Sequence, residues 1–447
     1  MWIFRRISML LAVFFITALS AMASSPLAGW WRGEVAMLPL VIHIEQDASG
    51  IFSGALYSPA QTDRDIPLDR VEVRGDSLSL RVSAIGFSYD GVLRDGLIRG
   101  RMIQGVEIPL TFSEASESDA TLYRPQTPRP PFLYDVSEVS FDNDSLHFAA
   151  TLTVPWTGCF GAVVLVSGSG AQNRDEEMLG HKPFAVISDM LTRMGWAVLR
   201  YDDRGVGGSS AGSPDDTTLD FATDAMAALR FLRSDKRFAG KPVGMLGHSE
   251  GGLIAVINAA EHPDSLDFII TLAGPAVKGS DLMVMQNRLV ASVSGVELPD
   301  DEVSSIEKTF AAIDSITDTA GLRVALDSLL HDGPSKARSI DVMTSPWYTA
   351  FVRTDPVPYL RRVRCPMLAL NGTWDAQVDA GQNLGSVRDN VPSAEVVALD
   401  GLNHMFQEAP SRAGSMNYGG ITQTISPVVL DRIGDFLTGV VKKRNAR

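Results

Sequence analysis

Residues 243–260 read VGMLGHSEGGLIAVINAA, and this stretch decides the fold of the larger part of the chain. Its apolar start, Val243–Leu246, predicts a buried strand, and its end, Gly252–Ala260, is compatible with a helix. Between them Gly247-His248-Ser249-Glu250-Gly251 forms a G-x-S-x-G motif, in the strand-turn-helix setting of a nucleophile elbow. A side chain at either glycine of the motif would obstruct the close passage of strand and helix. We therefore predict that Ser249 projects above a β-sheet, near a helix N-terminus that favours developing negative charge.

The same alternation of strand and helix extends over residues 133–447. Short apolar runs separated by helical periodicity are typical of a mainly parallel α/β sheet. Leu219–Leu232 has one apolar face and predicts a helix. Residues 277–358 show helical patterns without a strand, and they are too many for a direct crossover, so we expect a helical cap over the carboxyl edge of the sheet. The predicted buried strands are Val163–Val166, Ala197–Tyr201, Val243–Leu246, Phe268–Leu272 and Met367–Leu370.

Residues 24–124 have a different texture, with short β-like runs separated by turns. Pairs such as Ser49-Gly50, Asp90-Gly91 and Asp95-Gly96 predict several of these turns. The pattern indicates a small antiparallel β-domain, followed by a stiff Pro-rich linker at residues 125–132. At 447 residues the chain is long enough for about two or three structural units. The β-like runs are Val35–Glu45, Gly50–Tyr57, Val71–Val73, Ser77–Val82, Phe87–Leu93, Leu97–Met102 and Ile108–Phe112.

The N-terminus carries the pattern of a signal peptide. Arg5 and Arg6 precede the apolar run Ile7–Leu19, and Ala21-Met22-Ala23 offers a small-x-small cleavage site. The apolar run is shorter than the ~20 residues that a membrane-spanning helix needs. We expect residues 1–23 to be removed after Ala23 and the protein to be exported, periplasmic or secreted, without stable membrane insertion.

The net charge limits which partners the protein can bind, and the positions of the cysteines limit whether a disulfide can form. The formal net charge of −14 would repel a phosphate backbone, so nucleic-acid binding is disfavoured. Cys159 and Cys365 are the two cysteines of the chain, and each directly precedes a predicted strand of one sheet. Strands lie about 4.8 Å apart. A separation of several strands would exceed the ~7 Å limit for a disulfide, so we expect two free thiols.

The partners of Ser249 follow from chain order. In chains with such an elbow, the catalytic acid follows the serine in the sequence, and the histidine follows the acid. His404 is the one histidine of seven that lies C-terminal to His331, and it follows the strand-like run Glu395–Leu399. Asp375 follows the strand at Met367 and is the predicted acid, because the carboxyl ends of strands collect functional groups. Two other carboxylates compete with it for this role, Asp379 and Asp400.

Stabilisation of an oxyanion requires two N–H donors. The amide of Glu250 is one. The second should come from Ser167-Gly168-Ser169-Gly170, through Ser169 or Gly170, although a simple tight turn would also explain these residues. Charged residues beside such a turn more often fix loops than act on substrate. Those left without a role are His248, the Glu250 side chain, Arg174, Asp175, Asp203 and Arg204.

Taken together, five segments resemble the bacterial α/β-hydrolase carboxylesterases. They are SGSG at 167–170, NRDE at 173–176, RYDDRGVG at 200–207, GHSEGG at 247–252 and GLNHMF at 401–406. The likeness covers about Leu133 to the C-terminus, and the β-domain resembles a module attached to exported members. The resemblance implies an α/β-hydrolase fold and a serine esterase that acts on small acyl esters through an acyl-enzyme, without metal or cofactor. Where many relatives have His-Gly, this chain has Ser167-Gly168, which leaves the second donor open.

Three other functions remain for comparison. A peptidase of the prolyl-oligopeptidase type shares the catalytic domain, but the β-domain is too short for a propeller. A thioesterase is chemically close, although export makes acyl-CoA an improbable substrate. A polysaccharide-binding protein with a vestigial triad requires the Ser, Asp and His order to be accidental.

Overall fold

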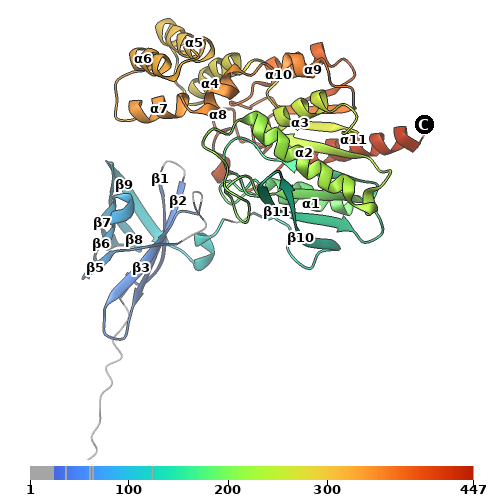
Figure 1. Ribbon diagram of the computed structural model, residues 1–447. Helices are drawn as coiled ribbons and strands as arrows, with labels where there is room; N and C mark the ends of the chain where they lie inside the picture. Colours follow the sequence, from blue (N-terminus) through green and yellow to red (C-terminus); the bar gives the residue numbers. More distant parts are fainter. Residues whose placement is uncertain (1–24, 36–37, 60–61, 63–64, 123, 446–447) are drawn as a thin grey trace, which may run out of the picture. The chain divides into compact units, whose positions relative to one another are not determined.

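The computed structural model describes residues 25–35, 38–59, 62, 65–122 and 124–445. The chain divides into two compact units, Met1–Thr121 and Leu122–Arg447 (Figure 1). The predicted signal peptide, residues 1–23, and its cleavage site lie outside the described residues. Among the residues that the structure does describe, none of the helices combines the length and the apolar character that crossing a membrane demands.

The first unit is an antiparallel sheet in the order β4-β3-β2-β1-β9-β8-β7-β6-β5. Strand β3 also lies close to β5, so the sheet curls around its own apolar core, which includes Trp31, Tyr89 and Phe112. At Asp95-Gly96 both residues have positive φ, as a tight hairpin turn requires. The strands are β1 Gly29–Val35, β2 Leu38–Gln46, β3 Phe52–Tyr57, β4 Ile66–Pro67, β5 Arg70–Arg74, β6 Ser77–Val82, β7 Phe87–Arg94, β8 Leu97–Gln104 and β9 Val106–Glu114.

Two local predictions for this unit are wrong. The predicted run Val35–Glu45 is not one strand, because β1 ends at Val35 and β2 begins at Leu38. Asp90-Gly91 is not a turn but lies inside β7. A Cβ at Gly91 would come 2.6 Å from the Tyr89 hydroxyl. Glycine is therefore used here to make room for a buried tyrosine, which donates to the backbone of β8 or β9.

The second unit is built on a mainly parallel sheet, as predicted. Its order is β10-β11-β13-β12-β14-β15-β16-β17, with the hairpin β10–β11 antiparallel at one edge. The sequence pattern does not predict this hairpin. The strands are β10 Tyr134–Asn143, β11 Leu146–Pro155, β12 Gly161–Val166, β13 Trp196–Tyr201, β14 Val243–His248, β15 Ile269–Leu272, β16 Met367–Gly372 and β17 Glu395–Leu399.

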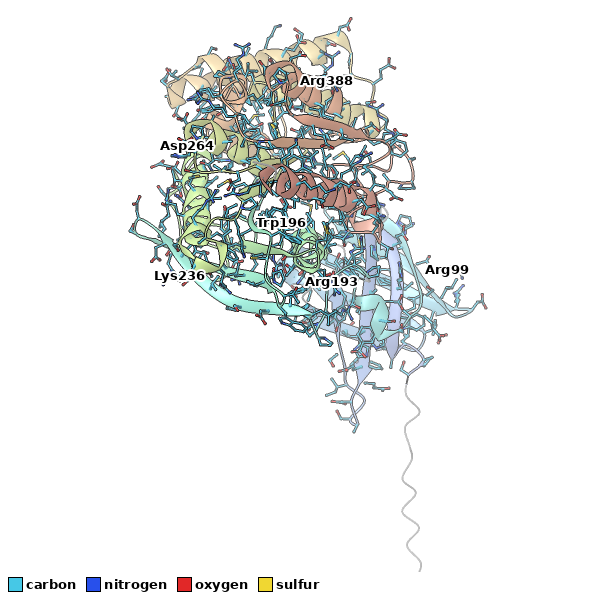
Figure 2. All side chains as sticks on the ribbon, turned by 90° about the vertical axis from the view of Figure 1, so that its right-hand side faces the viewer. Arg99, Arg193, Trp196, Lys236, Asp264 and Arg388 are labelled. Carbon is cyan, nitrogen blue, oxygen red and sulfur yellow. The ribbon has the colours of Figure 1, made fainter. Side chains whose placement is uncertain are left out.

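Helices cover both faces of this sheet (Figure 1). One face carries α2 Thr218–Ser234, α3 Glu250–Glu261, α9 Val357–Leu360 and α10 Ala380–Asn390, and the other carries α1 Pro183–Arg193 and α11 Pro427–Asn445. Figure 2 shows Trp196 within the layers, whereas Arg193, Lys236, Asp264 and Arg388 lie at the surface. The α/β-hydrolase fold is thereby confirmed.

The predicted cap is helical. Figure 1 shows α4 to α8 gathered at one end of the second unit. The cap has a small core of its own, which includes Phe310, Ile313, Leu322 and Leu326. Its helices are α4 Gly279–Val293, α5 Asp300–Ser315, α6 Thr319–Leu329, α7 Lys336–Met343 and α8 Pro346–Arg353.

The Pro-rich segment 125–132 lies within the second unit. The buried Arg124 before it donates to the carbonyl oxygens of Leu179, Gly419 and Ile421 at 2.8 to 3.0 Å. Gln126 accepts from the amide of Thr424 at 2.6 Å. The start of this segment is thus tied to residues far along the chain.

Both cysteines are free, as predicted. They precede β12 and β16, which are three positions apart in the sheet. Burial raises the pKa of the Cys365 thiol to about 12, so this thiol is protonated and unreactive near neutral pH.

Candidate active site

Ser249 occupies a strained turn between β14 and α3. Its backbone has φ 50° and ψ −121°, which is rare for a residue other than glycine. A Cβ at Gly247 would lie 2.0 Å from the carbonyl oxygen of Gly251, and one at Gly251 would lie 2.1 Å from that of Val166. No side chain fits at either position. The amide of Ser249 donates to Leu272 at 2.8 Å, which holds the turn against β15.

The structure brings the three predicted side chains together. Nε2 of His404 lies 3.2 Å from Oγ of Ser249, and Nδ1 lies 2.8 Å from Oδ2 of Asp375. The side chains of Asp375 and His404 are 0% and 5% exposed. The other oxygen of Asp375 accepts from the amides of Gln377 and Val378 at 2.8 and 2.9 Å. The carboxylate is therefore fixed through both oxygens, and such a chain can withdraw a proton from the serine.

The two rival carboxylates have other partners. Asp379 caps the N-terminus of α10 and accepts from the amide of Gln382 at 2.7 Å. Asp400 accepts from the hydroxyl of Thr373 at 3.0 Å. Neither has an interaction with His404 among those of the described residues, and Asp375 alone of the three is hydrogen-bonded to it there.

The structure distinguishes the candidate oxyanion donors. Glu250 is the first residue of α3, so its amide is free of the helical bonding pattern. In the loop of residues 167–170, the Gly168 amide donates to Oε1 of Glu176 at 2.7 Å. This amide is therefore not available to an oxyanion. Ser169 lines the pocket that contains Ser249 and His404, whereas Gly170 lines a neighbouring cavity instead. Of the two residues, Ser169 is thus the one beside Ser249 and His404.

The catalytic pocket has a volume of about 240 Å³. Ser249, His404 and Ser169 form its base. The cap contributes side chains from α4 and α8, so the cap and the sheet together enclose the reacting atoms. The cap residues that line it are Leu282, Met283, Gln286, Trp347, Tyr348 and Phe351.

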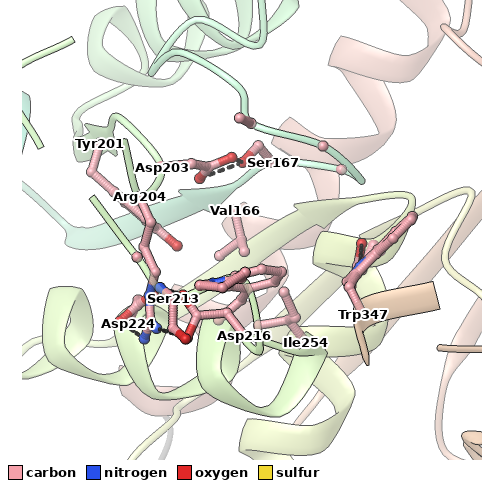
Figure 3. A pocket seen from close by; sticks show the side chains of 17 residues that line it. Val166, Ser167, Tyr201, Asp203, Arg204, Ser213, Asp216, Asp224, Ile254 and Trp347 are labelled. Carbon is pink, nitrogen blue, oxygen red and sulfur yellow. Dashed lines mark hydrogen bonds and ion pairs between the residues drawn. The ribbon is translucent and has the colours of Figure 1, made fainter. Parts of the chain in front are cut away.

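A second cavity of about 380 Å³ adjoins this pocket (Figure 3). Gly168 and Trp347 line both cavities. Arg204 forms ion pairs with Asp216 and Asp224 at 2.8 and 2.6 Å. Asp203 accepts from the Ser167 hydroxyl, and burial raises the pKa of Asp203 to about 7.

The unassigned charged residues have structural partners. Arg174 pairs with Asp202 at 2.7 Å, and Arg200 pairs with Asp175. The buried Glu250 side chain accepts from the Trp347 indole at 3.0 Å and from the Thr218 hydroxyl at 2.6 Å. Glu250 thereby ties α8 of the cap to α2 and α3. Sequence reasoning misses this tether because its members are distant along the chain and form no motif.

No three side chains of His, Cys, Asp or Glu converge on a common point suited to a metal ion in the part of the chain that the structure describes.

Known proteins are similar to this chain. A family model described as X-Pro dipeptidyl-peptidase (S15 family) matches residues 117–390. Esterase EstD of Thermotoga maritima is 27% identical over 277 residues, which make up 60% of this chain and 60% of EstD. A probable serine hydrolase of Drosophila melanogaster is 25% identical over 196 residues, 40% of this chain and 59% of that protein. The chain thus spans about three fifths of the length of these curated relatives.

Among solved structures, Est1E of Butyrivibrio proteoclasticus with bound ferulic acid has a TM-score of 0.43 and 17% identity, covering 68% of this chain and 99% of that one. The family model covers more than half of this chain and includes the elbow and Asp375. The chain therefore belongs to the X-Pro dipeptidyl-peptidase (S15) family of α/β hydrolases.

Proposed function

We propose that this hydrolase is a carboxylesterase that cleaves small acyl esters. The observation that carries the proposal is the hydrogen-bonded series Asp375, His404, Ser249 at the base of the catalytic pocket. Its volume of about 240 Å³ is below the ~300 Å³ at which pockets for drug-sized ligands begin, which suits a short acyl chain. The likeness to esterase EstD supports the same activity.

In this mechanism His404 removes the proton of the Ser249 hydroxyl as Oγ attacks the ester carbonyl carbon. The carbonyl π-bond opens, and the resulting oxyanion accepts from the amides of Glu250 and Ser169. Asp375 stabilises the imidazolium. When the intermediate collapses, the bond to the alcohol oxygen breaks and His404 returns its proton to the leaving alcohol. Water then attacks the acyl-enzyme by the same steps and releases the acid.

A second candidate is suggested by the family's description, which names an X-Pro dipeptidyl-peptidase. A peptidase would use the same serine, acid and histidine, but its leaving group is an amine. The two activities differ in their substrates and can be separated directly.

The test is hydrolysis of p-nitrophenyl esters from acetyl to decanoyl, run beside Ala-Pro-p-nitroanilide. We expect turnover of the short esters and little release from the anilide. Ser249→Ala is the control and should be inactive on both. Preferential cleavage of the anilide would establish the peptidase, and ester hydrolysis that persists in Ser249→Ala would refute the assigned nucleophile.

We also propose that the protein is exported, to the periplasm or beyond. The arginines, apolar run and small-x-small site at the N-terminus support this, although they lie outside the described residues. N-terminal sequencing of protein from the expressing bacterium should find Ser24 first. An intact Met1 would show that the segment is an anchor, and recovery of the protein in the cytoplasmic fraction would overturn the proposed export.

A further inference from the structure

Behind Ser249 three chain segments meet at one buried pair of side chains, Glu176 and His248. Oε1 of Glu176 lies 2.9 Å from Nδ1 of His248 and accepts from the Gly168 amide at 2.7 Å. Nε2 of His248 lies 3.0 Å from the carbonyl oxygen of His404. Glu176 and His248 are 3% and 5% exposed. The pair therefore joins the oxyanion loop, the elbow and the loop of the histidine.

The partners of His248 favour its protonated form. A carbonyl oxygen can only accept a hydrogen bond, so Nε2 of His248 must carry a proton. Nδ1 lies 2.9 Å from Oε1 of Glu176, which also accepts from the Gly168 amide, and an ionised Glu176 accepts a proton from Nδ1 as well. Burial opposes a charge on His248, but the charge and hydrogen bond of Glu176 outweigh burial and raise its pKa. Glu176 therefore favours the protonated form of His248.

The pair holds two backbone groups on which turnover depends. The bond from the Gly168 amide fixes the peptide next to the one that carries the Ser169 amide. The bond to the His404 carbonyl fixes the backbone of the general base, whose ring centroid lies 4.8 Å from that of His248. A Cβ at Gly168 would come 3.1 Å from Cβ of Ser249, so the oxyanion loop lies directly against the nucleophile.

A gain in folding stability does not explain why Glu176 and His248 are buried together. A buried ion pair gains little over well-packed apolar side chains, because both charges lose their hydration. Glu176 also adopts φ 50°, a conformation that is unfavourable for a residue other than glycine. Strain and buried charge of this kind collect where a precise geometry is needed for function.

We propose that Glu176 and His248 are positioning residues for ester hydrolysis: as a hydrogen-bonded pair they hold the Ser169 amide and the His404 backbone in register with Ser249. The inference rests on the proposed function. Both residues line the catalytic pocket, but in this positioning role they act through the Gly168 and His404 backbone, so they should affect the transition state more than substrate binding.

Glu176→Gln is the primary test, because it keeps the shape of the side chain and removes its charge. A displacement of catalytic groups by about 1 Å can cost about 100-fold in rate. We expect kcat on p-nitrophenyl acetate to fall by about 10- to 100-fold, with KM within about 2-fold of wild type. The affinity for a boronic acid, which forms a tetrahedral adduct on Ser249, should fall by a similar factor as kcat/KM.

Glu177→Gln is the matched control. Glu177 is the next residue along the chain, and its carboxylate pairs with Lys182 at 3.3 Å rather than with Gly168 or His248. It should keep wild-type kcat. His248→Gln is the second variant, and its loss of kcat should not multiply with that of Glu176→Gln in the double variant, since the two side chains act as one unit.

The outcomes separate the two hypotheses. If wild type neither hydrolyses the ester nor reacts with a fluorophosphonate at Ser249, the proposed function fails and the pair loses its role with it. An active wild type with Glu176→Gln and His248→Gln at full kcat would overturn the pair alone. So would a loss of kcat explained by a lower melting temperature in both variants, or failure of both to fold, since either result would make the pair purely structural.

Discussion

At the scale of single residues, Asp375 is separated from its rivals by the number of groups that hold it. One oxygen faces His404 at 2.8 Å and the other accepts two backbone amides. An asparagine would fit the same space, but its NH₂ group would have to face either the imidazole or the two amides. Facing the imidazole, it would favour the tautomer that cannot accept the proton of Ser249.

We predict that Asp375→Asn lowers kcat by about 10⁴ without loss of folding. Asp379→Asn is the control, because asparagine caps helices about as well as aspartate and should leave both kcat and the melting temperature unchanged. The measurement is p-nitrophenyl acetate turnover together with thermal unfolding. A mild Asp375→Asn beside a severe Asp379→Asn would reassign the acid.

His181 should make the folded protein sensitive to acid. It is fully buried, with its ring nitrogens 3.0 Å from the Thr424 hydroxyl and from the Tyr418 carbonyl. Burial lowers its pKa from 6.5 to about 4. Between these values the unfolded chain binds a proton that the folded protein does not, so stability falls as pH falls from about 6.5 to about 4.

His181→Gln should therefore reduce the loss of stability between pH 7 and pH 4.5, a loss of at most about 3 kcal/mol from this one group. His262→Gln is the control, because His262 is exposed at the end of α3. Urea unfolding at both pH values provides the measurement. An unchanged difference in His181→Gln would show that other groups cause the acid sensitivity.

Sequence reasoning at this scale works where one chemical role fixes a local pattern. Ser249, with its two flanking glycines, is predicted from a single stretch, and His404 from chain order. The choice between Ser169 and Gly170 depends on which amide faces the pocket. The role of Glu176 depends on contacts with residues 8 and 72 positions away. Neither the choice between Ser169 and Gly170 nor the role of Glu176 can be predicted from spacing along the chain.

At the scale of elements, the cap supplies one wall of the catalytic pocket. Met283 of α4 lines the pocket and also packs against the cap's own core, whereas Leu322 of α6 belongs to that core alone. The cap therefore contains residues that line the catalytic pocket and residues that only stabilise its helices. Substitutions in the two groups should have different effects.

Met283→Ala should enlarge the pocket and raise the ratio of kcat/KM for hexanoyl over acetyl esters, by about 5- to 50-fold, since burial of one methylene contributes about 0.8 kcal/mol. Leu322→Ala should lower the melting temperature through a cavity in the cap core and leave that ratio unchanged. Chain-length profiles of both variants are the measurement. Equal ratios in Met283→Ala and wild type would place the acyl chain elsewhere.

Most predicted strands of the second unit agree with the structure, although the apolar, buried strand β11 is not among them. The apolar strands of the parallel sheet are buried on both faces and stand out in the sequence. Strand β10 does not, because its side chains are mostly exposed and include Asp135, Ser137 and Glu138. Its ten residues are held by pairing with β11. An edge strand of this kind depends on its partner and has no apolar run of its own.

At the scale of the whole molecule, each unit has a separate apolar core, and no residue belongs to both. Ser249, Asp375 and His404 all lie in the second unit, which begins at Leu122. The sequence pattern places the start of the catalytic domain at Leu133, after the prolines. Residues 124 and 126 nevertheless hold the segment 418–425, which follows the loop of His404.

We predict that a chain starting at Leu122 folds and hydrolyses p-nitrophenyl acetate with kcat/KM within about 3-fold of the full chain, because all catalytic groups and their supports are present. A chain starting at Leu133 lacks Arg124 and Gln126, and four carbonyl oxygens lose a donor. Its free energy of unfolding should be lower by about 2–4 kcal/mol, because buried groups left without partners are costly. Urea unfolding and ester turnover of both chains are the measurements. Equal stability would show that the prolines mark the true boundary, and an inactive chain from Leu122 would show that the first unit contributes to catalysis.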